Sequence, residues 1–308
     1  MSHGGSTRAI FYALGANAGI AVAKYAAALW TGSGSMLAEA IHSTADCANQ
    51  LLLLLGMRQA RRPESEDHPL GHYRAPYFWA MVVALLLFFM GGAFSVYEGV
   101  ERLRHPQPLA NGVVAMAVLG IAVVLEAFSL WGAMREIRKE SGGKPFLRWF
   151  RETRQSELMV VAGEDIAALA GLALAFVAVS ATVITGDPLW DALGTLAVGV
   201  VLMVIALAVM VEVKSLIVGE SVAPEMRREI AEFLAGQAEI ASVMNVITLA
   251  WGEKVVIAVQ ARMRDTDSIS GTELVRRINA VEARLQERFP AARWVFFEPD
   301  EPRQDART

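Results

Sequence analysis

The 308-residue sequence has one cysteine and few charged residues, and both shortages exclude classes of protein. Cys47 alone can form neither an intramolecular disulfide nor a cysteine-based zinc finger. Lysine, arginine, aspartate and glutamate make up 19% of the residues, whereas 54% are hydrophobic. This composition is too apolar for an ordinary soluble protein and too charged for a chain buried in lipid throughout. We therefore expect a membrane domain joined to a soluble domain.

The sequence also lacks an excess of basic residues and several enzyme motifs. Its formal net charge is −4, which gives no indication of a nucleic-acid partner. It contains no GxxxxGK[ST] phosphate loop, so ATP is not expected to drive the protein. It contains neither the HExxH nor the GxSxG motif of a hydrolase. We predict a protein that is not an enzyme and that has no cofactor.

Six apolar stretches approach the ~20 residues that a bilayer requires. They cover approximately residues 8–30, 36–56, 76–100, 111–134, 156–185 and 189–211. Most basic residues of the connectors follow the second and fourth stretches, whereas the connectors after the first and fifth have none. By the positive-inside rule, both termini are expected in the cytoplasm. We predict a multi-pass protein of the bacterial inner membrane.

The character of the sequence changes after Lys214, where polar and apolar residues begin to alternate. The pattern predicts, in order, a helix at 224–234, strands at 242–250 and 254–263, a helix at 269–289 and a strand at 293–297. Ser270 and Glu273 form a capping box at the start of the second helix. The α-β-β-α-β order predicts a small open-faced sandwich, with its helices on one side of a sheet.

The predicted fold is therefore a membrane α-helical bundle of six transmembrane helices plus a small cytosolic α+β domain. Residues 1–212 form the transmembrane domain, and residues 213–308 form the C-terminal domain. The C-terminal domain contains no histidine and no cysteine. A metal site made from this domain alone would need carboxylates only, so we expect none there.

The second apolar stretch, MLAEAIHSTADCANQLLLLLG, carries polar residues on one helical stripe: Glu39, His42, Asp46 and Asn49. An ionisable residue in hydrocarbon costs roughly 2.5–3.5 kcal/mol on insertion scales, so such residues usually face a bundle interior or a water-filled cavity. His42 and Asp46 lie one turn apart and offer half of a tetrahedral site for a divalent metal. The alternative is a stripe that only hydrogen-bonds neighbouring helices, as we interpret Asn49.

The fifth apolar stretch contains adjacent carboxylates, Glu164 and Asp165, directly after Gly163. Charged groups at this depth rarely occur without a role. The structural alternative is a hydrogen-bonded pair beside a helix break at Gly163. Lys24 and Glu126 are single charges in other stretches, and we interpret them as structural partners for each other or for Glu39.

Several motifs, in order along the chain, resemble the cation diffusion facilitator family. They are SMLAEAIHSTAD at 35–46, DHPLGHYRAPYFWA at 67–80, EDIAALAG at 164–171, DPLWDALGTLAVG at 187–199 and LIVGESVAP at 216–224. The sequences of the second and fifth spans are most similar to the branch that contains zinc transporter nine. The resemblance implies six spans, cytosolic termini, a metallochaperone-like C-terminal domain and a homodimer. It also implies export of Zn²⁺ or a similar metal from the cytosol in exchange for protons.

His42 and Asp46 match the HxxxD pattern of the family's second span. In much of the family the fifth span carries a His or Asp four residues before its Asp, but this sequence has Val161 there, which cannot bind metal. Glu164 is the natural substitute, although it lies about 100° round the helix from Asp165. We predict that His42, Asp46 and Asp165 bind the metal and that Glu164 assists. Coordination by three protein ligands and coordination by four are both left open. Histidine with oxygen ligands suits Zn²⁺, with Mn²⁺, Co²⁺, Ni²⁺ or Fe²⁺ as alternatives.

The predicted function is a proton-coupled divalent-metal transporter that exports Zn²⁺ from the cytosol by alternating access. Metal ligands must be deprotonated, so protons and metal compete for the same groups. The expected partners are a divalent metal ion, the membrane and a second copy of the chain. The alternative is a transport-inactive scaffold or accessory subunit of the same fold, because Val161 breaks the family pattern.

Overall fold

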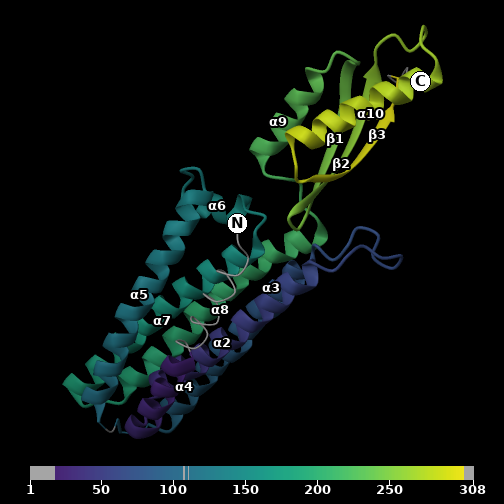
Figure 1. The fold of residues 1–308 in the computed structure, drawn as a ribbon. Helices are drawn as coiled ribbons and strands as arrows, with labels where there is room; N and C mark the ends of the chain where they lie inside the picture. The colour runs from purple at the N-terminus through teal and green to yellow at the C-terminus, as the bar shows by residue number, and fades with distance from the viewer. Residues whose placement is uncertain (1–17, 107, 110, 302–308) are drawn as a thin grey trace, which may run out of the picture. The chain divides into compact units, whose positions relative to one another are not determined.

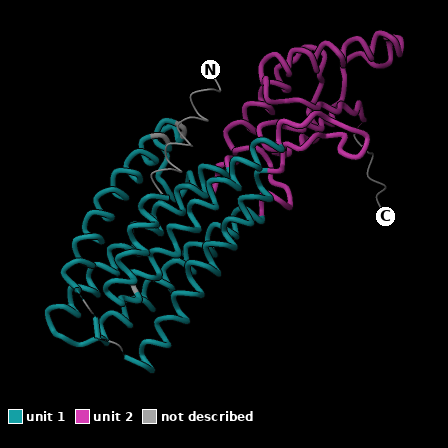
Figure 2. Tube along the Cα trace, turned by 60° about the horizontal axis from the view of Figure 1, so that its bottom comes forward, with its two compact units in different colours: residues 1–59, 76–150, 156–214 teal, residues 60–75, 151–155, 215–308 magenta. Residues whose placement is uncertain are grey.

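The computed structural model describes residues 18–106, 108–109 and 111–301. These residues form two compact units (Figure 2). The first unit contains the described residues up to 59, together with 76–150 and 156–214. The second contains residues 60–75, 151–155 and those from 215 onward. Two connectors of the helical part of the chain thus belong to the C-terminal unit, which the sequence did not indicate.

The first unit is a bundle of long helices that lie side by side (Figure 1). A helical segment at residues 18–31 comes first. The helices that follow are α2 (Gly34–Ala60), α3 (Ala75–Leu86), the π-helix η1 (Leu87–Ala93), α4 (Phe94–Arg104), α5 (Gly112–Glu140), α6 (Phe146–Glu152), α7 (Ser156–Thr185) and α8 (Leu189–Val218). The helix formed by α3, η1 and α4 is continuous from Ala75 to Arg104.

Four helices of the described chain are long and apolar enough to cross a membrane: Ala75–Arg104, Gly112–Lys139, Ser156–Thr185 and Leu189–Val218. The 27-residue α2 has sufficient length, but its polar stripe lowers its hydropathy. The predicted first span begins at residue 8, and its residues 8–17 lie outside the described part of the chain. The predicted membrane helical bundle is confirmed in this coarser form, with four helices in the described chain that could cross a membrane.

Small residues allow the helices of this bundle to approach closely, as is common between membrane helices. A Cβ atom added at Gly199 of α8 would lie 2.8 Å from the carbonyl oxygen of Gly92 and 2.7 Å from the backbone nitrogen of Val96. Those distances leave no room for any side chain, so the backbones of α8 and of the η1–α4 segment are in direct contact. Large apolar side chains fill the remaining interior, among them Met36, Leu87, Leu119, Leu172 and Leu202.

A buried polar cluster joins three helix ends around Asp191, in the first turn of α8. The Ser33 hydroxyl and the Gly34 backbone N–H, at the start of α2, each donate to Asp191 over 2.9 Å. Arg102 of α4 lies 3.8 Å from the same carboxylate and donates to the carbonyl of Gly32 over 2.6 Å. One carboxylate therefore satisfies donors from separate segments of the bundle.

The second unit is a three-stranded sheet with two helices. The strands are β1 (Ile240–Trp251), β2 (Lys254–Met263) and β3 (Ala292–Pro299), and the helices are α9 (Pro224–Ala235) and α10 (Gly271–Arg288). β1 pairs with β2 antiparallel, and β2 pairs with β3 parallel. Ile230, Leu234, Val281 and Leu285 of the helices pack in one core with Ile257 and Val259 of β2. The predicted α-β-β-α-β order is confirmed, and Ser270 caps α10 by accepting from the Glu273 N–H.

The connector at residues 60–75 contacts the sheet and its approach segment. The Trp251 indole donates to the carbonyl of Leu70 over 3.0 Å, and the Arg74 guanidinium lies 4.4 Å from the centre of the Trp251 ring. Arg74 also donates to the carbonyls of Leu216 and Ile217, at 2.6 and 2.5 Å. These contacts explain why this connector belongs to the C-terminal unit.

The connector at residues 151–155 contacts the same approach segment. Arg154 forms an ion pair with Glu220 at 2.8 Å and donates to the carbonyl of Ser221 over 2.8 Å. Residues 216–221 therefore bind both the connector that follows α2 and the connector that precedes α7.

We expect Asp191→Ala to lower the free energy of unfolding by about 2–3 kcal/mol, because it leaves a buried N–H and a hydroxyl without their charged acceptor and removes one of the carboxylates beside Arg102. Thermal unfolding in detergent, followed by tryptophan fluorescence, measures the effect. Glu101→Ala is the matched control on α4, because Glu101 pairs with His105 at an exposed position and such pairs contribute at most about 1 kcal/mol. Equal melting temperatures for the two variants would contradict a structural role for the cluster.

Candidate metal site

Helix α2 directs its polar stripe into the bundle. The side chains of Glu39, His42 and Asn49 are fully buried. His42 Nε2 lies 3.7 Å from Asp46 Oδ2, one turn further along, and the Asp46 side chain is 18% exposed. The period of an α-helix therefore produces the expected pairing of imidazole and carboxylate on one face.

Helix α7 presents its two adjacent carboxylates to different neighbours. Glu164 is buried and accepts a hydrogen bond from the side-chain amide of Asn49 on α2. Asp165 Oδ2 accepts from the Ser129 hydroxyl of α5 over 3.4 Å. Successive residues of an α-helix point about 100° apart, so the two carboxylates diverge although they are neighbours in sequence. The prediction that Asn49 bonds to another helix is confirmed.

The structure brings the predicted ligands into one region without closing a coordination shell. Within the part of the chain that the structure describes, no three histidine, cysteine, aspartate or glutamate side chains are grouped closely enough to hold a metal ion. His42 and Asp46 form a close pair, whereas Asp165 and Glu164 are bonded to Ser129 and Asn49. The candidate metal ligands therefore lie on two helices, α2 and α7, and are not gathered into one closed coordination site.

Unpaired polar atoms distinguish this region from an ordinary buried polar stripe. Both ring nitrogens of His42 and the Oδ1 atom of Asp46 are buried without a hydrogen-bond partner among the described residues. Most buried polar atoms in proteins have such a partner, so each exception needs an explanation. Imidazole nitrogen and carboxylate oxygen are good ligands for divalent transition metals, so these atoms are chemically suited to bind a cation.

A buried ion pair lies beside the His42–Asp46 pair. Lys24 Nζ lies 3.2 Å from Glu39 Oε2 and 2.7 Å from the Ser43 hydroxyl. From the sequence, Glu39 and Glu126 are both possible partners for Lys24. In the structure Lys24 pairs with Glu39. Ser43 was not identified from the sequence, although it lies four residues after Glu39 on the same helical face.

The π-helix η1 also approaches His42. A Cβ atom added at Gly91 of η1 would lie 3.6 Å from His42 Nδ1. The Ser95 hydroxyl donates to the carbonyl of Gly91 over 2.5 Å within the buried interior. π-Helical turns are rare and often occur at functional sites. Apart from the Gly91-Gly92 pair, no local sequence pattern indicates this turn.

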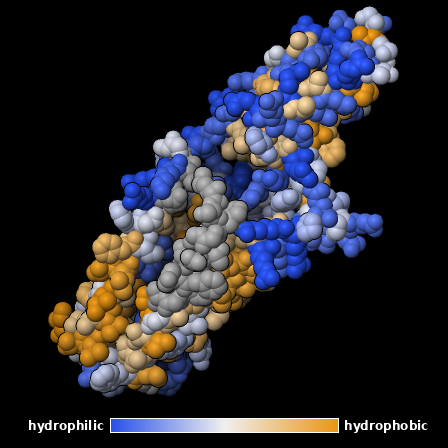
Figure 3. All heavy atoms as spheres, in the orientation of Figure 1, coloured by the Kyte–Doolittle hydropathy of each residue, from blue (hydrophilic) through white to orange (hydrophobic). Residues whose placement is uncertain are grey.

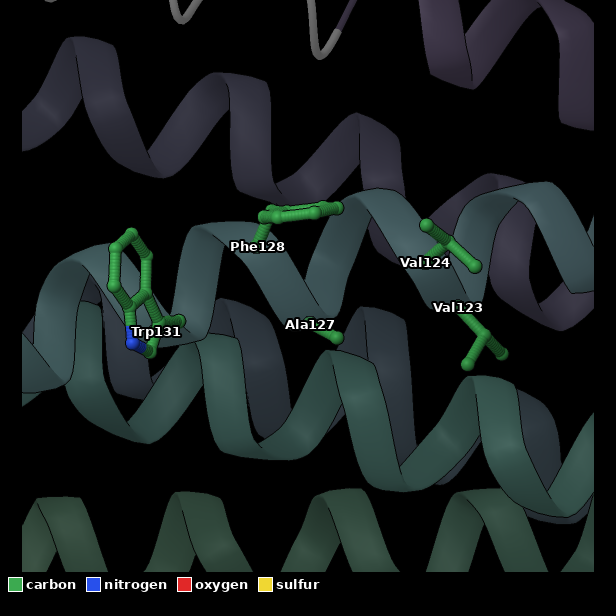
Figure 4. Close-up of a pocket in the computed structure, with 5 residues that line it drawn as sticks. All are labelled: Val123, Val124, Ala127, Phe128 and Trp131. Atoms are coloured by element: carbon green, nitrogen blue, oxygen red, sulfur yellow. The ribbon is translucent and has the colours of Figure 1, made fainter.

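A groove on the surface of α5 is unrelated to these donors. It has a volume of about 400 Å³ and is lined by Val123, Val124, Ala127, Phe128 and Trp131 (Figure 4). Hydrophobic side chains gather on the part of the first unit where α5 lies (Figure 3). The groove offers no metal ligand, and its surface is of the kind that lipid chains cover.

Comparisons with known proteins agree with the sequence motifs. The cation efflux transmembrane domain matches residues 10–218. The chain is 34% identical over 226 residues to the human "Proton-coupled zinc antiporter SLC30A9, mitochondrial", covering 72% of this chain and 40% of the antiporter. It is 28% identical over 219 residues to "Metal tolerance protein C4" of Arabidopsis thaliana, covering 70% and 48%. It is 26% identical over 268 residues to "Cation-efflux pump FieF" of Cronobacter sakazakii, covering 85% and 82%.

The chain spans less than half the length of the human and plant relatives. The matched region, residues 10–218, includes His42, Asp46, Glu164 and Asp165 and covers more than half of the chain. The buried donors of α2 and α7 thus lie in the region that defines the match. The chain belongs to the cation efflux, or cation diffusion facilitator, family, whose members are transporters and not enzymes.

Proposed function

We propose that this protein exports Zn²⁺ from the cytosol in exchange for protons, by alternating access. The observation that carries the proposal is the buried His42–Asp46 pair, whose ring nitrogens and Oδ1 atom lack partners among the described residues. The names of its relatives, a proton-coupled zinc antiporter and the zinc transporter ZitB of Escherichia coli, support Zn²⁺ as the substrate. Histidine combined with carboxylates also suits this metal.

In this proposal His42, Asp46 and Asp165 bind the transported ion, and Glu164 is the fourth group. The ligands must lose their protons before they bind metal, so each proton that enters the site favours release of the ion. Rigid-body movement of helices then exposes the site to one side of the membrane or the other, as in other secondary transporters. Asn49 donates a hydrogen bond to Glu164, so metal binding by Glu164 would exchange this hydrogen bond for a coordination bond.

The proposed topology has six spans, with the helical segment 18–31 and α2 crossing the membrane beside the four apolar helices. The uneven distribution of basic residues supports cytosolic termini and a cytosolic C-terminal domain at 213–308. The relatives include a mitochondrial antiporter and bacterial transporters. A bacterial inner membrane therefore stays a prediction.

A transport-inactive scaffold is the second candidate function. One sequence feature and one structural feature favour it. Val161 occupies the position where much of the family has a His or Asp, and the donors of α2 and α7 do not form a closed group within the described chain. A flux measurement separates the two functions.

Replacing His42, Asp46 or Asp165 with alanine is expected to reduce zinc flux at least tenfold, because removal of a ligand costs no less than the roughly 10–100-fold lost with a supporting residue. Flux into proteoliposomes under a proton gradient, reported by a trapped zinc dye, is the measurement. Asp187→Ala, which removes an exposed carboxylate from the α7–α8 turn, is the control and is expected to transport normally. Normal flux in Asp165→Ala would contradict a site on two helices, and absence of flux in the folded wild-type protein would favour the scaffold.

Glu164→Gln tests whether Glu164 is a ligand or only the acceptor of the Asn49 hydrogen bond. Glutamine keeps an oxygen that can accept from Asn49 but loses the negative charge that attracts metal. We expect at least a tenfold increase in the zinc concentration for half-maximal flux, the lower end of the roughly 10–100-fold range for supporting residues. An unchanged value in Glu164→Gln, with Asp165→Asn inactive in the same assay, would assign Glu164 to structure.

We also propose a homodimer, formed in part by an exposed apolar row on the face of the sheet opposite its helices. Helices α9 and α10 pack on one face, while the register places Ile247, Ala258 and Phe296 in one row across the other. Ile247 is 59% exposed and Phe296 is 57% exposed. Adjacent exposed apolar side chains often mark a protein interface, and a two-fold axis lets one such row meet its copy.

Phe296→Glu is expected to shift the full-length protein from dimer to monomer, because it places two like charges in the proposed interface. The mass of the detergent-solubilised protein, measured by light scattering after size exclusion, reports the change. Val275→Glu is the control, since Val275 is 56% exposed but lies on α10. A monomeric wild-type protein, or a dimeric Phe296→Glu variant, would contradict this interface.

A further inference from the structure

Lys24, Glu39 and Ser43 form a buried polar group that the proposed transport cycle does not use. Lys24 is 3% exposed and Glu39 is fully buried. The ammonium of Lys24 contacts Glu39 Oε2 at 3.2 Å and the Ser43 hydroxyl at 2.7 Å. Two charges are therefore held in the interior of the bundle, where burial of each is costly unless they are paired.

The ion pair uses only part of the Glu39 carboxylate. Its Oε1 atom is buried and has no hydrogen-bond partner within the described chain. This oxygen points at Gly171 of α7, where an added Cβ atom would lie 2.6 Å from it. The absence of a side chain at Gly171 leaves room for the carboxylate between α2 and α7, the two helices that carry the proposed ligands.

The group lies immediately beside the proposed site. Glu39 precedes His42 by one helical turn, and Ser43 follows His42 directly. Because Lys24 contacts both Glu39 and Ser43, its charge and that of Glu39 lie within about one helical turn of His42. A divalent ion bound by His42 and Asp46 would therefore be repelled by Lys24 and attracted by Glu39.

We propose that Lys24 limits the metal affinity of the transport site, as a tethered cation that keeps Glu39 from binding the transported metal. This inference rests on the proposed function. With the ammonium in place, Glu39 is neutralised and the metal has His42, Asp46 and the α7 carboxylates as ligands. Without it, Glu39 offers an additional carboxylate to the same ion. Lys24 thus limits metal affinity, which permits release on the far side of the membrane.

A purely structural ion pair would respond differently to mutation. Loss of either partner would leave the other charge buried and unpaired, and both single variants would be damaged in the same direction. The proposed role requires that the two single substitutions change the zinc affinity in opposite directions. Lys24→Met removes the repelling charge and frees Glu39, so we expect zinc to bind at least tenfold more tightly. Glu39→Gln leaves the charge of Lys24 uncompensated, so we expect zinc to bind at least tenfold more weakly.

The experiment is a double-mutant cycle on the full-length protein in detergent, with zinc affinity measured by competition with a fluorescent chelator. The affinity of Lys24→Met/Glu39→Gln is expected between those of the two single variants. Flux measurements add a second readout: tighter binding in Lys24→Met should lower KM and also lower kcat, because release becomes slower. A structural role would not lower KM.

Changes of the same sign in the two single variants, or an unchanged affinity in Lys24→Met, would overturn the inference. If Lys24→Met does not fold, Lys24→Gln replaces it in the cycle, and wild-type or tighter binding in Glu39→Gln also contradicts the proposal. Asp46→Ala separates this inference from the proposed function. Wild-type affinity in Asp46→Ala would overturn both, whereas lost binding in Asp46→Ala with no tightening in Lys24→Met would overturn only the role of Lys24.

Discussion

An ionisable group inside the bundle is costly to bury unless it has a partner, because the apolar interior does not solvate charge. Lys24 and Glu39 pair with each other, Glu164 accepts from Asn49, and Asp165 accepts from Ser129. His42 differs, since neither ring nitrogen has a hydrogen-bond partner in the described chain. These unsatisfied nitrogens are the reason for including His42 among the proposed metal ligands.

The same constraint shapes helix α2. Its polar residues make it less apolar than the four helices that are apolar enough to cross a membrane, so its stability depends on neighbours that cover the polar stripe. Lys24 and Glu164 come from two such neighbours. The helix that carries the best metal ligands is therefore also the helix that depends most on specific polar contacts. The polar side chains of α2 therefore both position the proposed metal ligands and hold the helix against its neighbours in the bundle.

The sequence predicted what local patterns determine. The fifth span was expected at 156–185, and α7 covers Ser156–Thr185. The element order of the C-terminal domain was also predicted, because alternation and capping residues are local signals. The association of the 60–75 connector with the sheet was not predicted, because Arg74 and Trp251 come into contact only in the folded chain. The different directions in which Glu164 and Asp165 make their hydrogen bonds depend on contacts with two other helices, which no local pattern encodes.

The π-helix η1 has a consequence for the residues beyond it. A π-helical turn holds more residues than an α-helical turn, so η1 is equivalent to a one-residue insertion that rotates the following helix by about 100°. Arg102 reaches Asp191 and Gly32 in this rotated register. Deleting a single residue between Leu87 and Ala93 would leave hydropathy and length almost unchanged, yet it would turn Arg102 away from its acceptors. Homologous chains that differ by one residue here would accordingly need a different arrangement of charges at the end of α4.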